Sequence, residues 1–164
     1  MAIQYSIHKA AEEDLPSLLR LNHELFEYEY AQGFSSTYDR KWTYSDAGTK
    51  YFRDIIESED KNAWIVFNEQ KIQAGFLIAV VHDLPYRDPS RVAEIEMVYI
   101  DEDYRCSGIG RDLVEHFKSW ASEKGAGILR VGALAGNKHA REFYEKWGFT
   151  EAEIMYEITV QKNS

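Results

Sequence analysis

The first third of the chain combines one strand-like pattern with two helix-like ones. Residues Ile3 to Ile7 alternate apolar and polar positions, which predicts a short strand. From Asp14 the apolar positions recur at helical spacing, and Pro16 falls in the first turn, where its missing N–H is not needed. A second helix is expected to follow Ser45 or Asp46, because either side chain can cap a first turn.

The next part of the pattern predicts a hairpin and then a crossover. Two β-rich runs, Ala63 to Phe67 and Ile72 to Val81, flank a short polar turn. Val92 to Ile100 returns to a strand pattern, an apolar helical stripe follows from Ile109 to Ala121, and Ile128 to Leu134 is the next strand. A strand, a helix and a strand over this length form a unit with parallel strands and a right-handed crossover.

The last part of the pattern predicts a short helix followed by more strand. The helix is expected over His139 to Trp147, and one or two final strands over Phe149 to Val160. The chain has 164 residues and 19.1 kDa, with no internal repeat and no hinge-like linker. We therefore expect one domain over residues 1–164.

A stretch without clear periodicity, Glu27 to Tyr44, is crowded with aromatic side chains. Its members are Tyr28, Tyr30, Phe34, Tyr38, Trp42 and Tyr44. Two interpretations are open. The stretch is either a loop packed over the core or the wall of a substrate pocket, since ligand pockets favour aromatic linings.

Charge and cysteine content exclude several classes of protein. Lys and Arg number 19 against 28 Asp and Glu, a net charge of -9, which disfavours a nucleic-acid partner and favours a cationic one. The single cysteine, Cys106, excludes an internal disulfide, and the five histidines lack metal-ligand spacing, so no metal is expected. There is no apolar run of about 18 residues and no signal-peptide pattern, so we expect no membrane association and a cytoplasmic location.

A glycine-containing loop lies where the strand ending at Ile100 meets the next helix. Glycines there let main-chain N–H groups converge, and the helix dipole adds positive charge, so the loop predicts an anion cradle. A P-loop is disfavoured because no Gly-Lys-Ser/Thr follows. A dinucleotide fingerprint is incomplete because Leu113 stands where its third glycine should be.

Two motifs at matching separation carry a family resemblance. The run Arg105-Cys106-Ser107-Gly108-Ile109-Gly110 meets the pattern Arg/Gln-x-x-Gly-x-Gly/Ala. Asn137 and the run Ala140 to Phe149 meet a later Asn followed by Ala-x-x-Phe-Tyr and Gly-Phe. Here the sequence resembles the GNAT superfamily of N-acetyltransferases over nearly its whole length. The implied fold is α/β (α+β), a single domain with a central mixed, splayed sheet of six to seven strands and about four helices.

The resemblance also implies acetyl-CoA as cosubstrate, with no metal. Pantetheine would enter where two parallel strands diverge, and its pyrophosphate would bind N–H groups at the helix start. The implied cofactor-binding set is Val98, Tyr99, Ile100, Arg105, Cys106, Ser107, Gly108, Ile109, Gly110, Arg111, Asn137 and Tyr144. Many relatives have a proline where Asp101-Glu102-Asp103 stands, and these carboxylates should face solvent.

Acetyl transfer to an amine needs a base, and Glu94 and Glu96 are the candidates, with Glu96 preferred. Strand alternation places both on the same face as Val98, although a bulge would change the facing. A solvated carboxylate remains the alternative for each. Tyr144 is the family-equivalent acid that protonates the leaving thiolate, and its alternative is a core tyrosine. Asn137 either caps the following helix and also contacts the cofactor, or only caps the helix.

The leading functional hypothesis is acetylation of a primary amine on a small, cationic molecule. Two alternatives remain, namely acetylation of a protein N-terminus or lysine, and a non-catalytic acyl-CoA binder or sensor. The resemblance also raises a homodimer as an expectation, and the predicted final strand, Ile154 to Val160, offers an edge for pairing.

Overall fold

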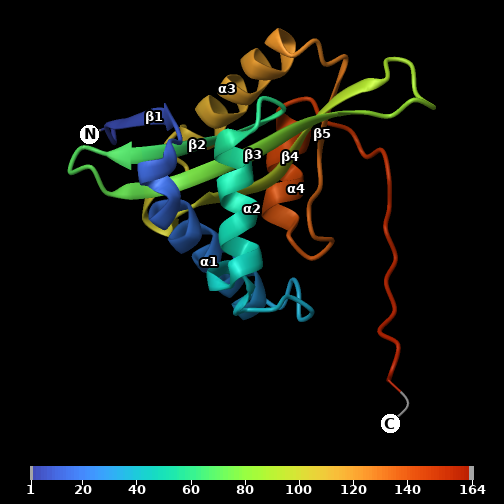
Figure 1. Cartoon of the computed structure of the whole chain (residues 1–164), viewed down its shortest axis with the longest axis horizontal. Coiled ribbons are helices and arrows are strands. Elements are labelled where there is room, and N and C mark those ends of the chain that lie inside the picture. Colours follow the sequence, from blue (N-terminus) through green and yellow to red (C-terminus); the bar gives the residue numbers. More distant parts are fainter. Residues whose placement is uncertain (1, 163–164) are drawn as a thin grey trace.

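A five-stranded mixed sheet organises the computed structural model, which describes residues 2–162 (Figure 1). Its strands follow one another in chain order across the sheet, and the first four pair antiparallel. β4 and β5 pair parallel, as the predicted crossover requires. The strands are β1 (Tyr5–Lys9), β2 (Lys61–Asn68), β3 (Gln73–Asp83), β4 (Arg91–Ile100) and β5 (Ile128–Val131).

Helices cover both faces of the sheet. One core cluster joins the first two helices to Phe76 and Ile78 of β3, and the other joins the third helix to Leu77 and Ala79 of the same strand. Figure 1 shows the first two helices crossing one face together. The α-helices are α1 (Leu15–Ala31), α2 (Asp46–Glu57), α3 (Ile109–Glu123) and α4 (Lys138–Lys146), and the short 3-10 helices are η1 (Glu12–Asp14), η2 (Trp42–Tyr44) and η3 (Glu102–Tyr104).

A β-bulge interrupts the middle of β4. Ile78 pairs with Met97 and Ala79 pairs with Ile95, so Glu96 is left without a partner on β3. One extra residue reverses the side-chain alternation of the strand beyond it. Side chains at the same alternate positions therefore point to opposite faces of the sheet before and after the bulge.

The sheet splays between β4 and β5. Only Val92 to Ile95 of β4 pair with β5, whose four residues are Ile128 to Val131. The edge of β4 from Glu96 to Ile100 that faces away from β3 therefore has no strand beside it among the described residues. The splay that the sequence resemblance implied therefore lies between these two strands.

Most predicted elements are confirmed, and Ser45 caps α2 through its side chain, which accepts a hydrogen bond from the Gly48 N–H. The predicted count of six to seven strands is wrong, because the sheet has five. β5 ends at Val131 rather than Leu134, and within residues 2–162 no strand follows it. The segment after α4 is extended but runs away from the sheet (Figure 1), so it has no neighbour to complete a ladder.

Candidate active site

The start of α3 presents a cluster of unused main-chain donors. Gly108 precedes the helix with φ 93°, and Cys106 also has a positive φ, 60°. These conformations turn successive N–H groups inward, and glycine adopts them without a Cβ penalty. Among the described residues, the N–H groups from Cys106 to Arg111 have no hydrogen-bond acceptor in the protein. Free donors at a helix N-terminus form an anion site.

Two of the three carboxylates before this cradle face solvent, as expected. Glu102 and Asp103 are exposed, and Asp101 is half-buried, where its side chain accepts a hydrogen bond from the Asp103 N–H. Glu102 also lies 3.7 Å from the Arg105 guanidinium. The prediction that these acids face solvent is confirmed for Glu102 and Asp103, so they leave the cradle open to an anion.

The side chain of Arg105 contacts other residues of the protein and does not point into solvent. Its Nε donates to the Ile100 carbonyl at 2.9 Å, and its guanidinium lies 4.4 Å from the Tyr28 ring and 5.9 Å from the Tyr99 ring. Stacking and hydrogen bonding of this kind fix a planar guanidinium in one position. Arg105 thereby links the loop that forms the cradle to β4 and to α1.

The main chain of β4 offers groups to the cleft at alternate residues. The Asp101 N–H donates to Ala74 of β3, so residues in phase with Asp101 pair with β3, while Val98 and Ile100 point their main-chain groups the other way. Arg105 already occupies the Ile100 carbonyl. The groups left for a ligand are therefore those of Val98 and the N–H of Ile100. Tyr99, in phase with Asp101, does not offer its main chain here.

Tyr144 on α4 is a buried phenol close to a carboxylate. Its side chain is 8% exposed and meets Phe143 and Phe149 edge to face. Burial, and then the nearby charge of Glu29, raise the pKa of Tyr144 well above its ordinary value. Its hydroxyl has no hydrogen-bond partner among the described residues, so it is free to donate a proton to a ligand.

The helix that carries Tyr144 is fixed at its start and along its side. Asn137 caps α4 by accepting a hydrogen bond from the Ala140 N–H at 3.1 Å, as both interpretations of this residue require. A Cβ at Gly110 would come within 3.1 Å of the Phe143 ring. The small residue at this position lets α4 lie close to the start of α3, which holds Tyr144 near the cradle.

A cleft of about 640 Å³ lies on the α1 and α2 side of β4. Its walls combine aromatic rings with three carboxylates. Two residues of the aromatic stretch, Tyr38 and Trp42, line this cleft, and Trp42 also packs against the core. The lining residues are Phe26, Thr37, Tyr38, Asp39, Trp42, Tyr51, Glu94, Ile95, Glu96, Met97 and Gly132. Aromatic faces and carboxylates together suit a cation.

Both candidate bases lie in this cleft, but not on the face first expected. Val98 packs on the α3 side of the sheet, whereas Glu94 and Glu96 line the cleft on the opposite side, because the bulge reverses the alternation between them and Val98. Glu96 accepts a hydrogen bond from the Tyr51 hydroxyl. Glu94 lies 3.8 Å from the His82 ring.

The structure adds residues that the sequence motifs did not reveal. Burial, and then hydrogen bonding to Glu96, raise the pKa of Tyr51 well above its ordinary value, so it remains a donor. Glu29 of α1 is half-buried, and burial raises its pKa, an effect that the Tyr38 hydroxyl partly offsets. Glu29 lies within the aromatic stretch Glu27 to Tyr44, whereas Tyr51 lies outside it and belongs to no motif.

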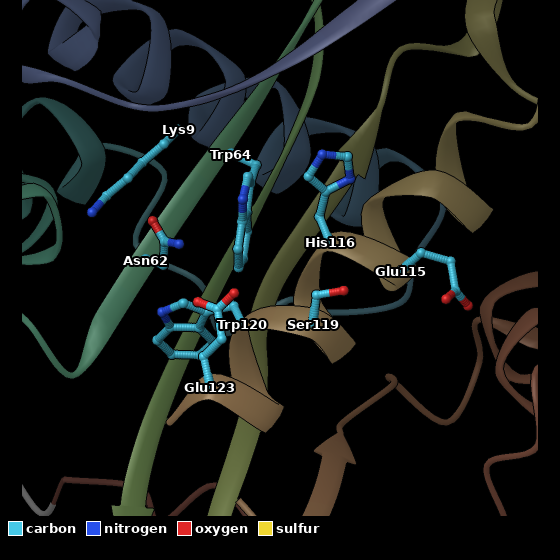
Figure 2. Close-up of a pocket in the computed structure, with 8 residues that line it drawn as sticks. All are labelled: Lys9, Asn62, Trp64, Glu115, His116, Ser119, Trp120 and Glu123. Carbon is cyan, nitrogen blue, oxygen red and sulfur yellow. The ribbon is translucent and has the colours of Figure 1, made fainter. Parts of the chain in front are cut away.

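A second hollow, of about 400 Å³, lies on the opposite face of the sheet (Figure 2). Trp64 of β2 and Trp120 of α3 meet there edge to face, with ring centroids 5.8 Å apart, and charged side chains such as Glu123 surround them. None of the predicted site residues lines it. Over residues 2–162 there is also no group of three or more His, Cys, Asp or Glu that could hold a metal ion, and no helix long and apolar enough to cross a membrane.

The fold is that of N-acetyltransferases of known structure. The aminoglycoside acetyltransferase AAC(6')-Iy, in complex with a CoA-containing bisubstrate analogue, superposes with a TM-score of 0.76 at 17% identity over 97% of this chain and 99% of that one. An aminoglycoside 6'-N-acetyltransferase from Acinetobacter baumannii gives 0.74 at 18% identity, over 98% and 100% of the two chains. Residues 5–149 match the acetyltransferase (GNAT) family, and the chain belongs to that family.

Sequence relatives agree with this placement. An uncharacterised N-acetyltransferase from Methanocaldococcus jannaschii is 26% identical over 92% of this chain, which spans only 63% of that relative's length. A thialysine N-epsilon-acetyltransferase from Bos taurus is 28% identical to this chain. The matched region covers 90% of this chain and 86% of the length of that relative.

Proposed function

We propose that this protein is an N-acetyltransferase that moves the acetyl group of acetyl-CoA directly to a primary amine of a small, cationic acceptor. One observation carries the proposal. The splayed end of β4 leads into a cradle of free main-chain N–H groups. The bulge of the same strand lines a cleft of aromatic rings and carboxylates. The first feature suits a nucleotide diphosphate, and the second suits an amine.

The residues at the cradle fit the cosubstrate. The N–H groups from Cys106 to Arg111 would hold the pyrophosphate, and Val98 with the N–H of Ile100 would pair with the pantetheine amides as an added strand. The same family's structures include AAC(6')-Iy in complex with CoA. Main-chain donors would bind the phosphates here, so the proposed mode of binding needs no metal.

Tyr144 is proposed as the general acid. A raised pKa keeps the phenol protonated at neutral pH, and its hydroxyl has no partner in the protein. It would donate its proton to the thiolate of CoA as the thioester breaks. The ring contacts with Phe143 and Phe149 hold the hydroxyl in place.

Glu96 is proposed as the group that removes a proton from the acceptor amine, directly or through water. Free alkyl amines have a pKa of about 10.4, so at neutral pH the attacking amine must first lose a proton. Glu96 lies at the bulge, and the Tyr51 hydroxyl orients its carboxylate. Glu94 would then bind the cationic acceptor.

The acceptor class follows from the cleft. Asp39, Glu94 and Glu96 contribute negative charge, and Phe26, Trp42 and Tyr51 contribute aromatic faces. The relatives named for thialysine and for aminoglycosides both act on amine-bearing small molecules by their names, which supports this assignment. A diamine, a polyamine or an amino sugar has the required chemistry.

An acceptor screen with thiol detection tests the proposal. We expect release of CoA above the rate of hydrolysis with at least one small polycationic amine, and heat on titration of CoA into the protein. Binding of CoA with no turnover on any amine would favour a non-catalytic binder. Turnover confined to peptide N-termini or lysines would favour a protein acetyltransferase.

A matched pair of variants separates the two glutamates. Glu96→Gln is expected to lower kcat about 10²-fold, because it removes a general base, and Glu94→Gln to act mainly on the KM of the acceptor. Both changes remove one charge from the same strand and cleft. A larger kcat effect from Glu94→Gln would reverse the assignment, and no kcat effect from either would leave the proton to a chain of water.

A further inference from the structure

The hollow between β2 and α3, which we name the α3 hollow, has no part in the acetyl transfer proposed above. Its volume of about 400 Å³ lies in the range of small-molecule pockets, roughly 300–1,000 Å³. None of its lining residues belongs to the N–H cradle or to the acceptor cleft, which lies on the opposite face of the sheet. Any ligand of the α3 hollow would therefore bind apart from CoA and from the acceptor amine.

The α3 hollow lies where the edge strand of the sheet ends. Lys9, the last residue of β1, pairs with Trp64 of β2. Asn62 comes two residues earlier on β2 and faces the same side as Trp64, but β1 ends before it reaches a residue opposite Asn62. Trp120 of α3 meets Trp64 edge to face at 5.8 Å, and the hollow opens beside these two rings (Figure 2). Two indole rings therefore form an apolar wall next to a polar amide.

Three donors of this wall have no acceptor in the protein, although their side chains are buried. Asn62 and Trp64 are each 5% exposed, and Trp120 is 9% exposed. Asn62 accepts a hydrogen bond from the Ala63 N–H, but neither its NH₂ group nor either indole N–H donates one within residues 2–162. In that range only His23 Nδ1 lacks both a partner and access to solvent, so the three donors keep that access. Donors of this kind bind oxygen atoms of water or of a ligand.

Charged side chains of both signs lie at the rim of the α3 hollow. Lys9 and Glu123, which follows Trp120 by one helical turn, are both exposed, and within residues 2–162 neither forms an ion pair with the other or with a third residue. Glu115 differs, because its carboxylate pairs with Lys118 at 3.3 Å and points away from the other lining residues (Figure 2). The rim therefore offers one cation and one anion to a ligand.

We propose that the α3 hollow binds a free α-amino acid with an apolar side chain. The carboxylate of the ligand accepts hydrogen bonds from the Asn62 NH₂ group and the Lys9 ammonium, and its ammonium pairs with Glu123. Its side chain packs against Trp64 and Trp120. A simple cation would leave Lys9 and the buried donors unpaired, and a simple carboxylate would leave Glu123 unpaired, so a zwitterion fits best. This proposal does not depend on acetyl transfer.

The four tryptophans of the chain report where an amino acid binds. Trp64 and Trp120 line the α3 hollow, Trp42 lines the acceptor cleft, and Trp147 follows α4. Trp42→Phe and Trp147→Phe identify two of the four indole N–H signals in the NMR spectrum, which leaves the other two to the hollow. Titration of L-phenylalanine into the full chain should shift those two signals. Movement of the Trp42 signal alone, or no movement at about 10 mM ligand, would overturn the proposal.

Two analogues of the same size test the recognition of both charges. Phenylpropionate lacks the ammonium of L-phenylalanine, and phenylalaninamide lacks its carboxylate, whereas both keep the aromatic ring. We expect each analogue to bind the α3 hollow about tenfold more weakly than L-phenylalanine, measured from the same indole signals, because one group at the rim loses its partner. An analogue that shifts these signals with the same affinity as L-phenylalanine would show that the hollow recognises a single charge, against the proposal.

Substitutions at the rim test the protein side of the same contacts. Lys9→Gln and Glu123→Gln change exposed side chains and leave the core intact, and each should weaken binding of L-phenylalanine about fivefold. Glu115→Gln removes the same charge from the same helix, but that carboxylate points toward Lys118, so the affinity should change less than about twofold. Equal losses from Glu115→Gln and Glu123→Gln, or no loss from Lys9→Gln, would overturn the proposed pairing.

Discussion

The hydroxyl group of Tyr144 can be removed with little effect on packing. Its removal is therefore the sharpest test of a single residue. Tyr144→Phe retains the ring that meets Phe143 and Phe149 and loses only the hydroxyl. We expect kcat to fall about 10²-fold, because the thiolate must leave without a positioned acid, while the Kd for CoA changes little. Steady-state kinetics and calorimetry measure the two effects.

The pH dependence provides the check on this assignment. Since the pKa of Tyr144 is raised above its ordinary value of about 10, the group stays protonated below that pH, and it should cause no loss of activity on the alkaline side there. A high-pH limb below pH 10 that is present in the native enzyme and absent in Tyr144→Phe would show that Tyr144 titrates without the raised pKa, whereas an unchanged kcat in Tyr144→Phe at all pH values would contradict its role as the acid.

Reasoning from sequence named Glu94 and Glu96 of β4 as candidates but could not fix the face of the sheet on which they lie. Strict alternation placed Glu94 and Glu96 with Val98, and one unpaired residue in the ladder, Glu96 itself, moved them to the opposite face. A bulge depends on the register of the neighbouring strand, β3, so no local pattern in β4 predicts it. Glu29 of α1, whose charge helps to raise the pKa of Tyr144, likewise belongs to no local motif.

At the scale of elements, the two ends of α3 supply a matched pair of glycines. Gly108 precedes the helix with φ 93° and Gly125 follows it with φ 73°, and an added Cβ meets no atom within 3.7 Å at the first or 4 Å at the second. Alanine at either position should reduce stability by about 1 kcal/mol through backbone strain. Only Gly108→Ala should also weaken CoA binding, by about tenfold, because it disturbs the N–H cradle. Equal CoA affinities for the two variants would contradict the cradle.

The contact between β1 and α3 gives a prediction about stability. The Tyr5 hydroxyl donates to Asp112 at 2.6 Å, and this bond is the largest cause of the lowered pKa of Asp112. Burial, and then the same hydrogen bond, raise the pKa of Tyr5 to about 12. Tyr5→Phe should lower the free energy of unfolding at pH 7 by about 1 kcal/mol, measured by urea denaturation.

The signs of the two shifts define where that difference disappears. Asp112 contributes stability above its unfolded pKa of about 4, and this contribution is lost as the pH falls through its lower folded value. Tyr5 contributes below pH 10, and its contribution is lost as the pH rises toward about 12. The difference between the native chain and Tyr5→Phe should therefore shrink at both extremes. Tyr86→Phe, which removes a hydroxyl from a side chain that is 80% exposed, should show no difference at any pH.

At the scale of the whole molecule, the sequence predicted what local and periodic patterns determine. The hairpin, the parallel crossover and the caps at Ser45 and Asn137 follow from short segments, and the structure has them. The final strands predicted over Phe149 to Val160 are absent from residues 2–162. A strand, however, needs a neighbour, and periodicity does not say whether one chain supplies it. The predicted number of strands was wrong for this reason.

The overall charge yields a prediction about substrate capture. The chain carries a net charge of -9, and Asp39, Glu94 and Glu96 line the cleft, so a polyamine should be attracted over distances that salt screens. We expect kcat/KM for a polyamine to fall about tenfold between roughly 20 mM and 500 mM salt, and that for a monoamine of similar length to fall less. Asp39→Asn should flatten the salt dependence for the polyamine, because it removes a cleft charge while its amide oxygen can still accept the Lys41 N–H. Glu115→Gln, an equal change of charge on α3 outside the cleft, serves as the control. Identical salt slopes for the two amines would show that the cleft does not select its acceptor by charge.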